Sequence, residues 1–222
     1  MIGSPVSLPL RDGVELSGLL WTPNGPGPFP ALLMRQPYGA RIASTVVYAH
    51  PSWYAQQGYL VLVLDVRGRG DSGGEFSGFA SEATDGDDAL AWLKAHPLCN
   101  GRVGSYGFSY QGLTQLLGTD TNLQPDALAP AMCGLDERLH WASEGGAHWW
   151  VLSLSWGLQL AAESCRRRGD QHAWQAIKDC LAGAQQSRHG LALLKQHDSN
   201  NPVLEWLQND PSQAAEWACH QP

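Results

Sequence analysis

Long apolar runs and an excess of positive charge are both missing from this sequence of 222 residues. No uninterrupted stretch of about 18 apolar residues occurs, so we expect no membrane-spanning helix and no membrane partner. Lys and Arg together number 14 against 21 Asp and Glu, which gives a net charge of −7. A nucleic-acid-binding protein needs the opposite balance, so we expect no nucleic-acid partner.

Cysteine is scarce, and its pattern excludes several classes of small domain. No C-x-x-C pair occurs, which argues against a zinc knuckle, a redox motif and a disulfide scaffold. Residues 1–5 lack the basic and apolar segments of a secretory signal peptide. Because widely spaced cysteines of odd number fit a reducing compartment, we expect a cytoplasmic protein. The five cysteines are Cys99, Cys133, Cys165, Cys180 and Cys219.

Glycine, proline and tryptophan are distributed unevenly, and the distribution divides the chain in two. Seventeen of the 25 glycines fall at or before Gly112, and no proline occurs between Pro130 and Pro202. Seven of the ten tryptophans lie at or after Trp141. We therefore expect strands joined by tight turns over residues 1–135 and a helical region over residues 136–222.

Strands that alternate with helices predict an α/β fold for the first part. The clearest strand is 59–65, because a nearly continuous apolar run is typical of a strand covered on both faces. We expect Gly58 to end one helix and Ser81 to cap another. The expected strands are 6–10, 14–21, 31–34, 59–65, 102–107 and 126–132, and the expected helices are 51–58, 82–96 and 113–117. Helical spacing of apolar residues predicts further helices over 147–164, 171–184 and 202–209, and no strand there.

The segment with the strongest chemical signal is G-F-S-Y-Q-G at 107–112. A serine with small neighbours between a strand and a helix is the pattern of a nucleophile elbow, in which a sharp turn lifts the hydroxyl above the sheet edge. The helix N-terminus there stabilises developing negative charge. The same pattern also fits a serine that caps an ordinary helix, and the segment alone leaves both interpretations open. Its second glycine, Gly112, stands one position later than in the generic G-x-S-x-G.

Two further segments accompany this one. R-Q-P-Y-G (35–39) follows an early strand, and D-V-R-G-R-G-D-S-G-G-E-F (65–76) follows the next. In this order and spacing the three segments resemble the Xaa-Pro dipeptidyl-peptidase / cocaine esterase (CocE/NonD) family, whose members show R-x-P-Y, D-x-R-G-x-x-x-S-x-G-E-F and G-x-S-Y-x-G. The resemblance covers residues 5 to about 135. It implies the N-terminal strands of an incomplete α/β-hydrolase sheet, with 136–222 as the start of a helical cap.

The resemblance implies roles for three residues. Ser109 corresponds to the nucleophile of a serine hydrolase, which transfers an acyl group from an ester or amide through an acyl-enzyme. The backbone N–H of Tyr110 and the hydroxyl of Tyr38 correspond to the two oxyanion donors, and losing one such donor typically costs about 10²–10³ in rate. This chemistry needs no metal and no organic cofactor. The expected partner is a small ester or amide, or a short peptide.

A base and an acid for a Ser-His-acid triad are not identified in the sequence. In the resembled family both follow the cap, on later strands, and its members are more than twice as long. The histidines after Ser109 do not follow strand-like runs, so we interpret them as surface or packing residues; they are His140, His148, His172, His189, His197 and His220. His50, before the serine, is expected to be solvated or to cap a helix. An incomplete sheet leaves an open edge, so we expect self-association or a complementary C-terminal half.

Other interpretations stay open beside the enzymatic one. The chain could be a non-catalytic hydrolase-like module or fragment that binds a ligand or a partner chain. G-R-G-D-S-G (68–73) also fits the G-x-G-x-x-G of a dinucleotide-binding loop, but a helix would have to begin directly after it. In the helical part, tryptophans could line an acyl pocket or form core, and Asp136 and Glu144 could hold a substrate ammonium. These tryptophans are Trp141, Trp149, Trp150 and Trp156.

Overall fold

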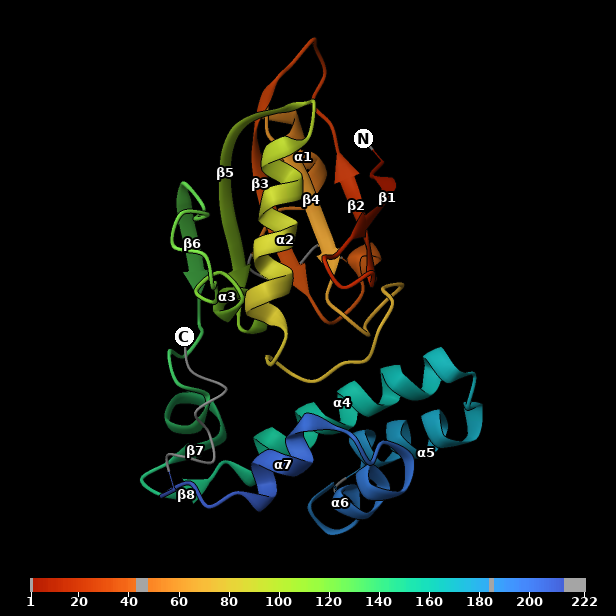
Figure 1. The fold of residues 1–222 in the computed structure, drawn as a ribbon. Coiled ribbons are helices and arrows are strands. Elements are labelled where there is room, and N and C mark those ends of the chain that lie inside the picture. Colours follow the sequence, from red (N-terminus) through yellow and green to blue (C-terminus); the bar gives the residue numbers. More distant parts are fainter. Residues whose placement is uncertain (1, 43–47, 184–185, 214–222) are drawn as a thin grey trace. The chain divides into compact units, whose positions relative to one another are not determined.

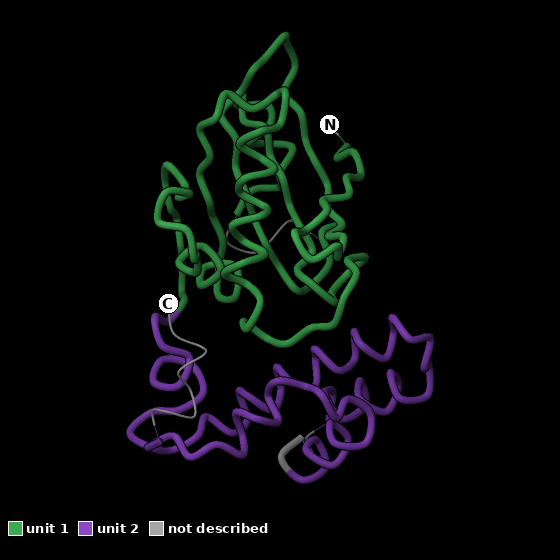
Figure 2. Tube along the Cα trace, viewed as in Figure 1, with its two compact units in different colours: residues 1–133 green, residues 134–222 purple. Residues whose placement is uncertain are grey.

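The computed structural model describes residues 2–42, 48–183 and 186–213. The chain divides into two compact units, residues 1–133 and residues 134–222 (Figure 2). The first unit holds a mixed six-stranded sheet and the second is mainly helical (Figure 1). The expectation of an α/β part followed by a helical part is therefore confirmed.

The sheet has the strand order β1-β2-β4-β3-β5-β6. Strands β4, β3, β5 and β6 run parallel, while β1 and β2 are antiparallel to their neighbours. Because the central strands are parallel, their carboxyl ends meet at one edge of the sheet. The strands are β1 (Ser4–Pro9), β2 (Glu15–Trp21), β3 (Phe29–Gln36), β4 (Leu60–Asp65), β5 (Cys99–Phe108) and β6 (Ala127–Ala131).

Helices cover both faces of this sheet. Leu62 of β4 belongs to a cluster with Leu93 of α2 (Glu82–Ala95), whereas Val63 belongs to a cluster with Ala55 of α1 (Pro51–Gln56). Neighbouring residues of a strand point to opposite faces, so α1 and α2 lie on opposite sides. All six residues of β4 are buried, as its apolar run predicts. Two short helical segments complete the unit: the 3₁₀-helix η1 (Ala40–Ile42) and α3 (Tyr110–Leu113).

The second unit is built around helix α4, which contacts α5, α6 and α7. Glycine permits these close approaches: a Cβ on Gly157 of α4 would lie 3.0 Å from Leu194 of α6 and from Val203 of α7. Trp141, Trp156 and Trp206 pack together with ring centroids 5.0–5.8 Å apart. The elements are η2 (Arg138–Ala142, a π-helix), β7 (Ser143–Glu144), β8 (Ala147–His148), α4 (Trp150–Arg168), α5 (Gln171–Ala182), α6 (Gln186–His197) and α7 (Pro202–Gln208).

Several expectations for local structure are wrong in detail. Helix α6 was not expected, because Gly190 and many polar residues hide the apolar face that packs on α4. The small hairpin β7–β8 was also not expected in a helical region. Ser81 precedes α2 but makes no side-chain capping bond, whereas Gly58, with φ +93°, ends α1 as expected.

The dinucleotide-binding hypothesis is wrong. A loop of residues 66–81 separates β4 from α2, so no helix begins directly after 68–73 as a pyrophosphate site requires. Among the described residues, no helix is both long and apolar enough to cross a membrane.

Candidate active site

Ser109, the expected nucleophile, and Tyr38, an expected oxyanion donor, follow two neighbouring strands at the same edge of the sheet. Strand β3 pairs in parallel with β5, and Leu33 lies opposite Ser105. Tyr38 comes two residues after the end of β3, and Ser109 directly follows β5. The structure therefore brings both residues to the carboxyl edge of the parallel strands, where ligands of open α/β sheets bind.

Ser109 has a strained backbone. Its φ of 59° and ψ of −118° lie outside the regions that a residue with a side chain ordinarily adopts. Its backbone N–H donates to the carbonyl oxygen of Ala131 at the end of β6, over 2.9 Å. Its side chain makes no capping hydrogen bond to α3 and is half-buried. These properties favour a nucleophile elbow over an ordinary helix cap, because strain of about 1–3 kcal/mol is retained where function requires it.

The two glycines of the elbow are required for space. A Cβ on Gly107 would lie 2.3 Å from the Cβ of Gln111, so strand and helix approach too closely for any side chain. A Cβ on Gly112 would lie 2.9 Å from the Cβ of Cys133 and 3.0 Å from the carbonyl oxygen of Ala131. The shifted second glycine therefore lets the end of β6 approach α3. Gln111, in the usual glycine position, is buried and accepts from the backbone N–H of Phe108 over 3.2 Å.

Tyr110 is the first residue of α3 and directly follows Ser109. Its side chain is completely buried, and its ring stacks on Phe79 with centroids 4.1 Å apart. Its hydroxyl donates to Oε1 of Glu82 over 2.8 Å and lies 3.0 Å from the carbonyl oxygen of Gly78. The residue after the expected nucleophile is thus held by the loop before α2 and by α2 itself.

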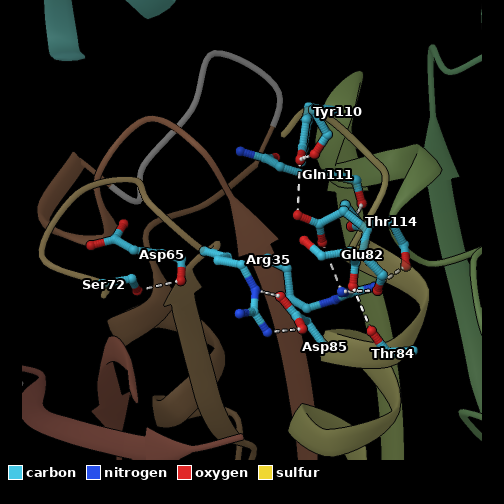
Figure 3. A network of polar contacts seen from close by, with 12 residues as sticks. Arg35, Asp65, Ser72, Glu82, Thr84, Asp85, Tyr110, Gln111 and Thr114 are labelled. Atoms are coloured by element: carbon cyan, nitrogen blue, oxygen red, sulfur yellow. Dashed lines mark hydrogen bonds and ion pairs between the residues drawn. The ribbon is translucent and has the colours of Figure 1, made fainter. Parts of the chain in front are cut away.

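A buried ion pair connects β3, α2 and α3 (Figure 3). Arg35 is 6% exposed and its Nη1 donates to Oε2 of Glu82 over 2.8 Å and to the Glu82 carbonyl oxygen over 2.6 Å. Its Nη2 donates to the carbonyl oxygen of Thr114, the C-cap residue of α3. Burial raises the pKa of Glu82, while Arg35 and the Tyr110 hydroxyl act in the opposite direction. In the sequence, a charged residue at the end of the apolar run 31–34 indicates a buried pair, but the pattern does not identify the partner.

The loop after β4 is structural. The Asp65 carboxylate accepts from the backbone N–H of Asp71 over 3.0 Å, and a Cβ on Gly70 would lie 2.0 Å from that carboxylate. Arg67 binds the carboxylate of Asp85 in α2 with two hydrogen bonds of 2.7 and 2.9 Å. Buried Arg69 donates to the carbonyl oxygen of Pro37, the residue before Tyr38, over 3.1 Å. The loop therefore links the segment that carries Tyr38 to the rest of the unit.

Neither histidine of the first unit lies at the edge that carries Ser109. His96 follows α2 and its carbonyl oxygen accepts from the backbone N–H of Cys99, so the ten residues of β5, about 30 Å, separate it from Ser109. Burial lowers the pKa of His96. His50 contacts the Trp21 ring, with centroids 5.7 Å apart. In the sheet register, Trp21 of β2 lies level with Gly104 of β5. Gly104 is five residues before Ser109 and β2 is three strands from β5, so Trp21 lies about 20 Å from Ser109.

The later histidines belong to the second unit. His140 accepts through Nδ1 from the backbone N–H groups of Leu135 and Asp136, which agrees with a structural role. His220 and Cys219 lie outside the described residues. Within the residues that the structure describes, no group of three His, Cys, Asp or Glu side chains is arranged to hold a metal ion.

Comparison with known proteins identifies the family of this chain. A family model described as X-Pro dipeptidyl-peptidase (S15 family) matches residues 12–222. The chain belongs to this family. The cocaine esterase of Rhodococcus sp. (strain MB1 Bresler) is 33% identical over 173 residues, which cover 76% of this chain and 30% of that relative. The family resemblance expected from the three segments is thereby confirmed.

Solved structures show the same fold over part of their length. A CocE/NonD family hydrolase from Staphylococcus aureus has a TM-score of 0.64 and 21% identity, over 92% of this chain and 38% of that chain. An α-amino acid ester hydrolase has a TM-score of 0.59 and 22% identity, over 88% and 40%. The chain therefore spans less than half the length of each of these three proteins.

Because the backbone of Ser109 is strained, glycine at this position should give a more stable protein than alanine. We expect Ser109→Gly to have a free energy of unfolding about 1–2 kcal/mol higher than Ser109→Ala, because glycine adopts positive φ without a steric penalty. Urea denaturation of the two variants measures the difference. Ser105, in the middle of β5 and without positive φ, is the control: Ser105→Gly should be less stable than Ser105→Ala. Equal stability of the two Ser109 variants would contradict the strained elbow.

The buried ion pair predicts a large loss of stability. We expect Glu82→Gln to lower the free energy of unfolding by about 3–5 kcal/mol, because it leaves the Arg35 charge buried without its counter-charge. Asp71→Asn, in the solvent-exposed pair with Arg41, is the control and should leave the denaturation midpoint nearly unchanged. A small effect of Glu82→Gln would show that Arg35 finds sufficient partners among the carbonyl groups.

Proposed function

We propose that this chain carries the nucleophile and oxyanion donors of a serine hydrolase, which transfers acyl groups from esters or amides through an acyl-enzyme on Ser109. The observation that carries the proposal is the strained backbone of Ser109 at the β5–α3 turn, with a φ of 59° and a ψ of −118°. Membership of the X-Pro dipeptidyl-peptidase family supports the reaction class.

In this proposal Ser109 Oγ attacks the substrate carbonyl carbon while a base takes its proton. The carbonyl oxygen becomes an oxyanion, which receives hydrogen bonds from the Tyr110 backbone N–H and the Tyr38 hydroxyl. Collapse of this intermediate breaks the bond to the leaving alcohol or amine, which takes up the proton. Water then releases the acyl group from Ser109 by the same steps.

The base and acid of the triad are proposed to come from the part of the family that this chain does not span. Both histidines of the first unit lie far from Ser109, as the strand register shows. The relatives are much longer, since the chain covers only 30% of the cocaine esterase. In the first unit, β6 ends the sheet with four of its five residues exposed. We infer that a complementary C-terminal half, or a second copy of the chain, pairs there.

We propose different roles for the two parts of the chain. Residues 1–135 would supply the catalytic part of the hydrolase, and residues 136–222 the start of its helical cap. The relatives' names include a cocaine esterase and an α-amino acid ester hydrolase, so we propose small esters, amides or short peptides as substrates. The competing hypothesis, a non-catalytic module that binds a ligand or partner chain, is separated by the labelling experiment below.

A fluorophosphonate probe tests whether the elbow is competent. We expect the purified chain to form one covalent adduct on Ser109 when free imidazole is added as a substitute base, detected by intact mass and located by peptide mapping. Ser109→Ala should form none. Labelling without imidazole would still support Ser109 as the nucleophile, but it would place the base within the chain and contradict a base from the missing part of the family. A folded chain that is never labelled at Ser109 would overturn the proposal in favour of a binding module.

The Tyr38 hydroxyl is tested as an oxyanion donor. We expect Tyr38→Phe to slow labelling of Ser109 by about 10²–10³, because one of two donors to the developing charge is lost. Tyr38 is 39% exposed, so the change should leave the unfolding midpoint unaltered. Tyr59→Phe is the matched control, since Tyr59 is 37% exposed but precedes β4, at the other end of the strands. An unchanged rate in Tyr38→Phe would remove this residue from the site.

A further inference from the structure

Helix α3 is held at both ends by one buried ion pair. At its first residue, the Tyr110 hydroxyl donates to Oε1 of Glu82 over 2.8 Å. At its C-cap, the carbonyl oxygen of Thr114 accepts from Nη2 of Arg35. Arg35 and Glu82 are themselves joined by a bond of 2.8 Å between Nη1 and Oε2. The two attachments of α3 therefore converge on the same two charged side chains (Figure 3).

A helix of four residues cannot maintain its own orientation. It contains too few hydrogen-bonded turns to be stable alone, so its direction depends on tertiary contacts. Because Tyr110 is the first residue of α3, the direction of its backbone N–H depends on the orientation of this helix. Because a displacement of about 1 Å in a catalytic group can cost about 10² in rate, these contacts bear directly on the oxyanion site.

We propose that Glu82 is a positioning residue of the oxyanion hole, which acts through the Tyr110 hydroxyl and through Arg35. This inference rests on the proposed function of Ser109. Its carboxylate has a different task at each oxygen: Oε1 fixes the side chain of Tyr110, and Oε2 holds Arg35. Arg35 stands three residues before Tyr38 in the same segment. One carboxylate is thus connected to the segments that carry both oxyanion donors.

The Tyr110 ring is held by aromatic contacts, so its hydroxyl oxygen can be removed while the ring stays in place. The ring lies against Phe79, and its centroid is 6.2 Å from that of Phe76. Tyr110→Phe keeps these contacts and the backbone N–H, and removes only the hydroxyl, which reaches Glu82 and the carbonyl oxygen of Gly78. Tyr106, on the same strand-helix segment, is a matched control. Among the described residues its buried hydroxyl has no hydrogen-bond partner, so Tyr106→Phe deletes an oxygen without deleting an attachment.

The experiment compares Ser109 labelling by the fluorophosphonate probe in the full chain, with imidazole present. The maximal rate of labelling and the probe concentration at half-maximal rate are measured separately, on variants that show a cooperative unfolding transition. We expect Tyr110→Phe to lower the maximal rate at least tenfold with little change in the half-maximal concentration. Tyr106→Phe should match the wild type in both. A role in stability alone would not change the maximal rate of folded protein.

A second variant protects the test against misfolding. Glu82→Asp keeps the negative charge near Arg35 but shortens the reach toward the Tyr110 hydroxyl by one methylene group, and it should lower the maximal rate in the same direction. If both variants label as fast as wild type, the positioning role of Glu82 is overturned while the proposed function stands. If wild type itself is never labelled at Ser109, the proposed function is overturned, and this inference with it.

Discussion

The buried pair of Arg35 and Glu82 is the constraint on which the geometry of the site depends. Both side chains are buried, so each charge must be satisfied mainly by the other and by neighbouring carbonyl and hydroxyl groups. That requirement joins three elements distant in sequence: the end of β3, the first turn of α2 and both ends of α3. Gly86 of α2 leaves the necessary space, because a Cβ there would lie 2.5 Å from Arg35 Nη2.

Strain at Ser109 and the close contacts around it are two aspects of one arrangement. A residue with positive φ and an unusual ψ persists only where its surroundings leave no alternative. Here β5 precedes Ser109, the Ala131 carbonyl holds its N–H, and the glycines at 107 and 112 allow the strand and helix to meet. The strained turn lies in a unit whose core includes the fully buried strand β4 and apolar clusters on both of its faces.

This chain contains only part of the catalytic machinery that we propose for its family. The chain belongs to the X-Pro dipeptidyl-peptidase family but spans well under half of its longer relatives. In our proposal it contains the nucleophile and both oxyanion donors, which come from the ends of β3 and β5. In the same proposal the base comes from outside the first unit, because His50 and His96 both lie away from that edge.

The sequence by itself determined the features with a local cause: the buried strand β4, the ends of α1, the α/β character and the tight turn at Ser109 between a strand and a helix. Periodicity, glycine placement and short motifs record these directly, because they depend on neighbouring residues. Only the tertiary structure decided the strand order, helix α6 and the partner of Arg35, which lies 47 residues away at Glu82. A buried charge requires a counter-charge, but which of 21 acidic residues supplies it depends on how distant segments pack.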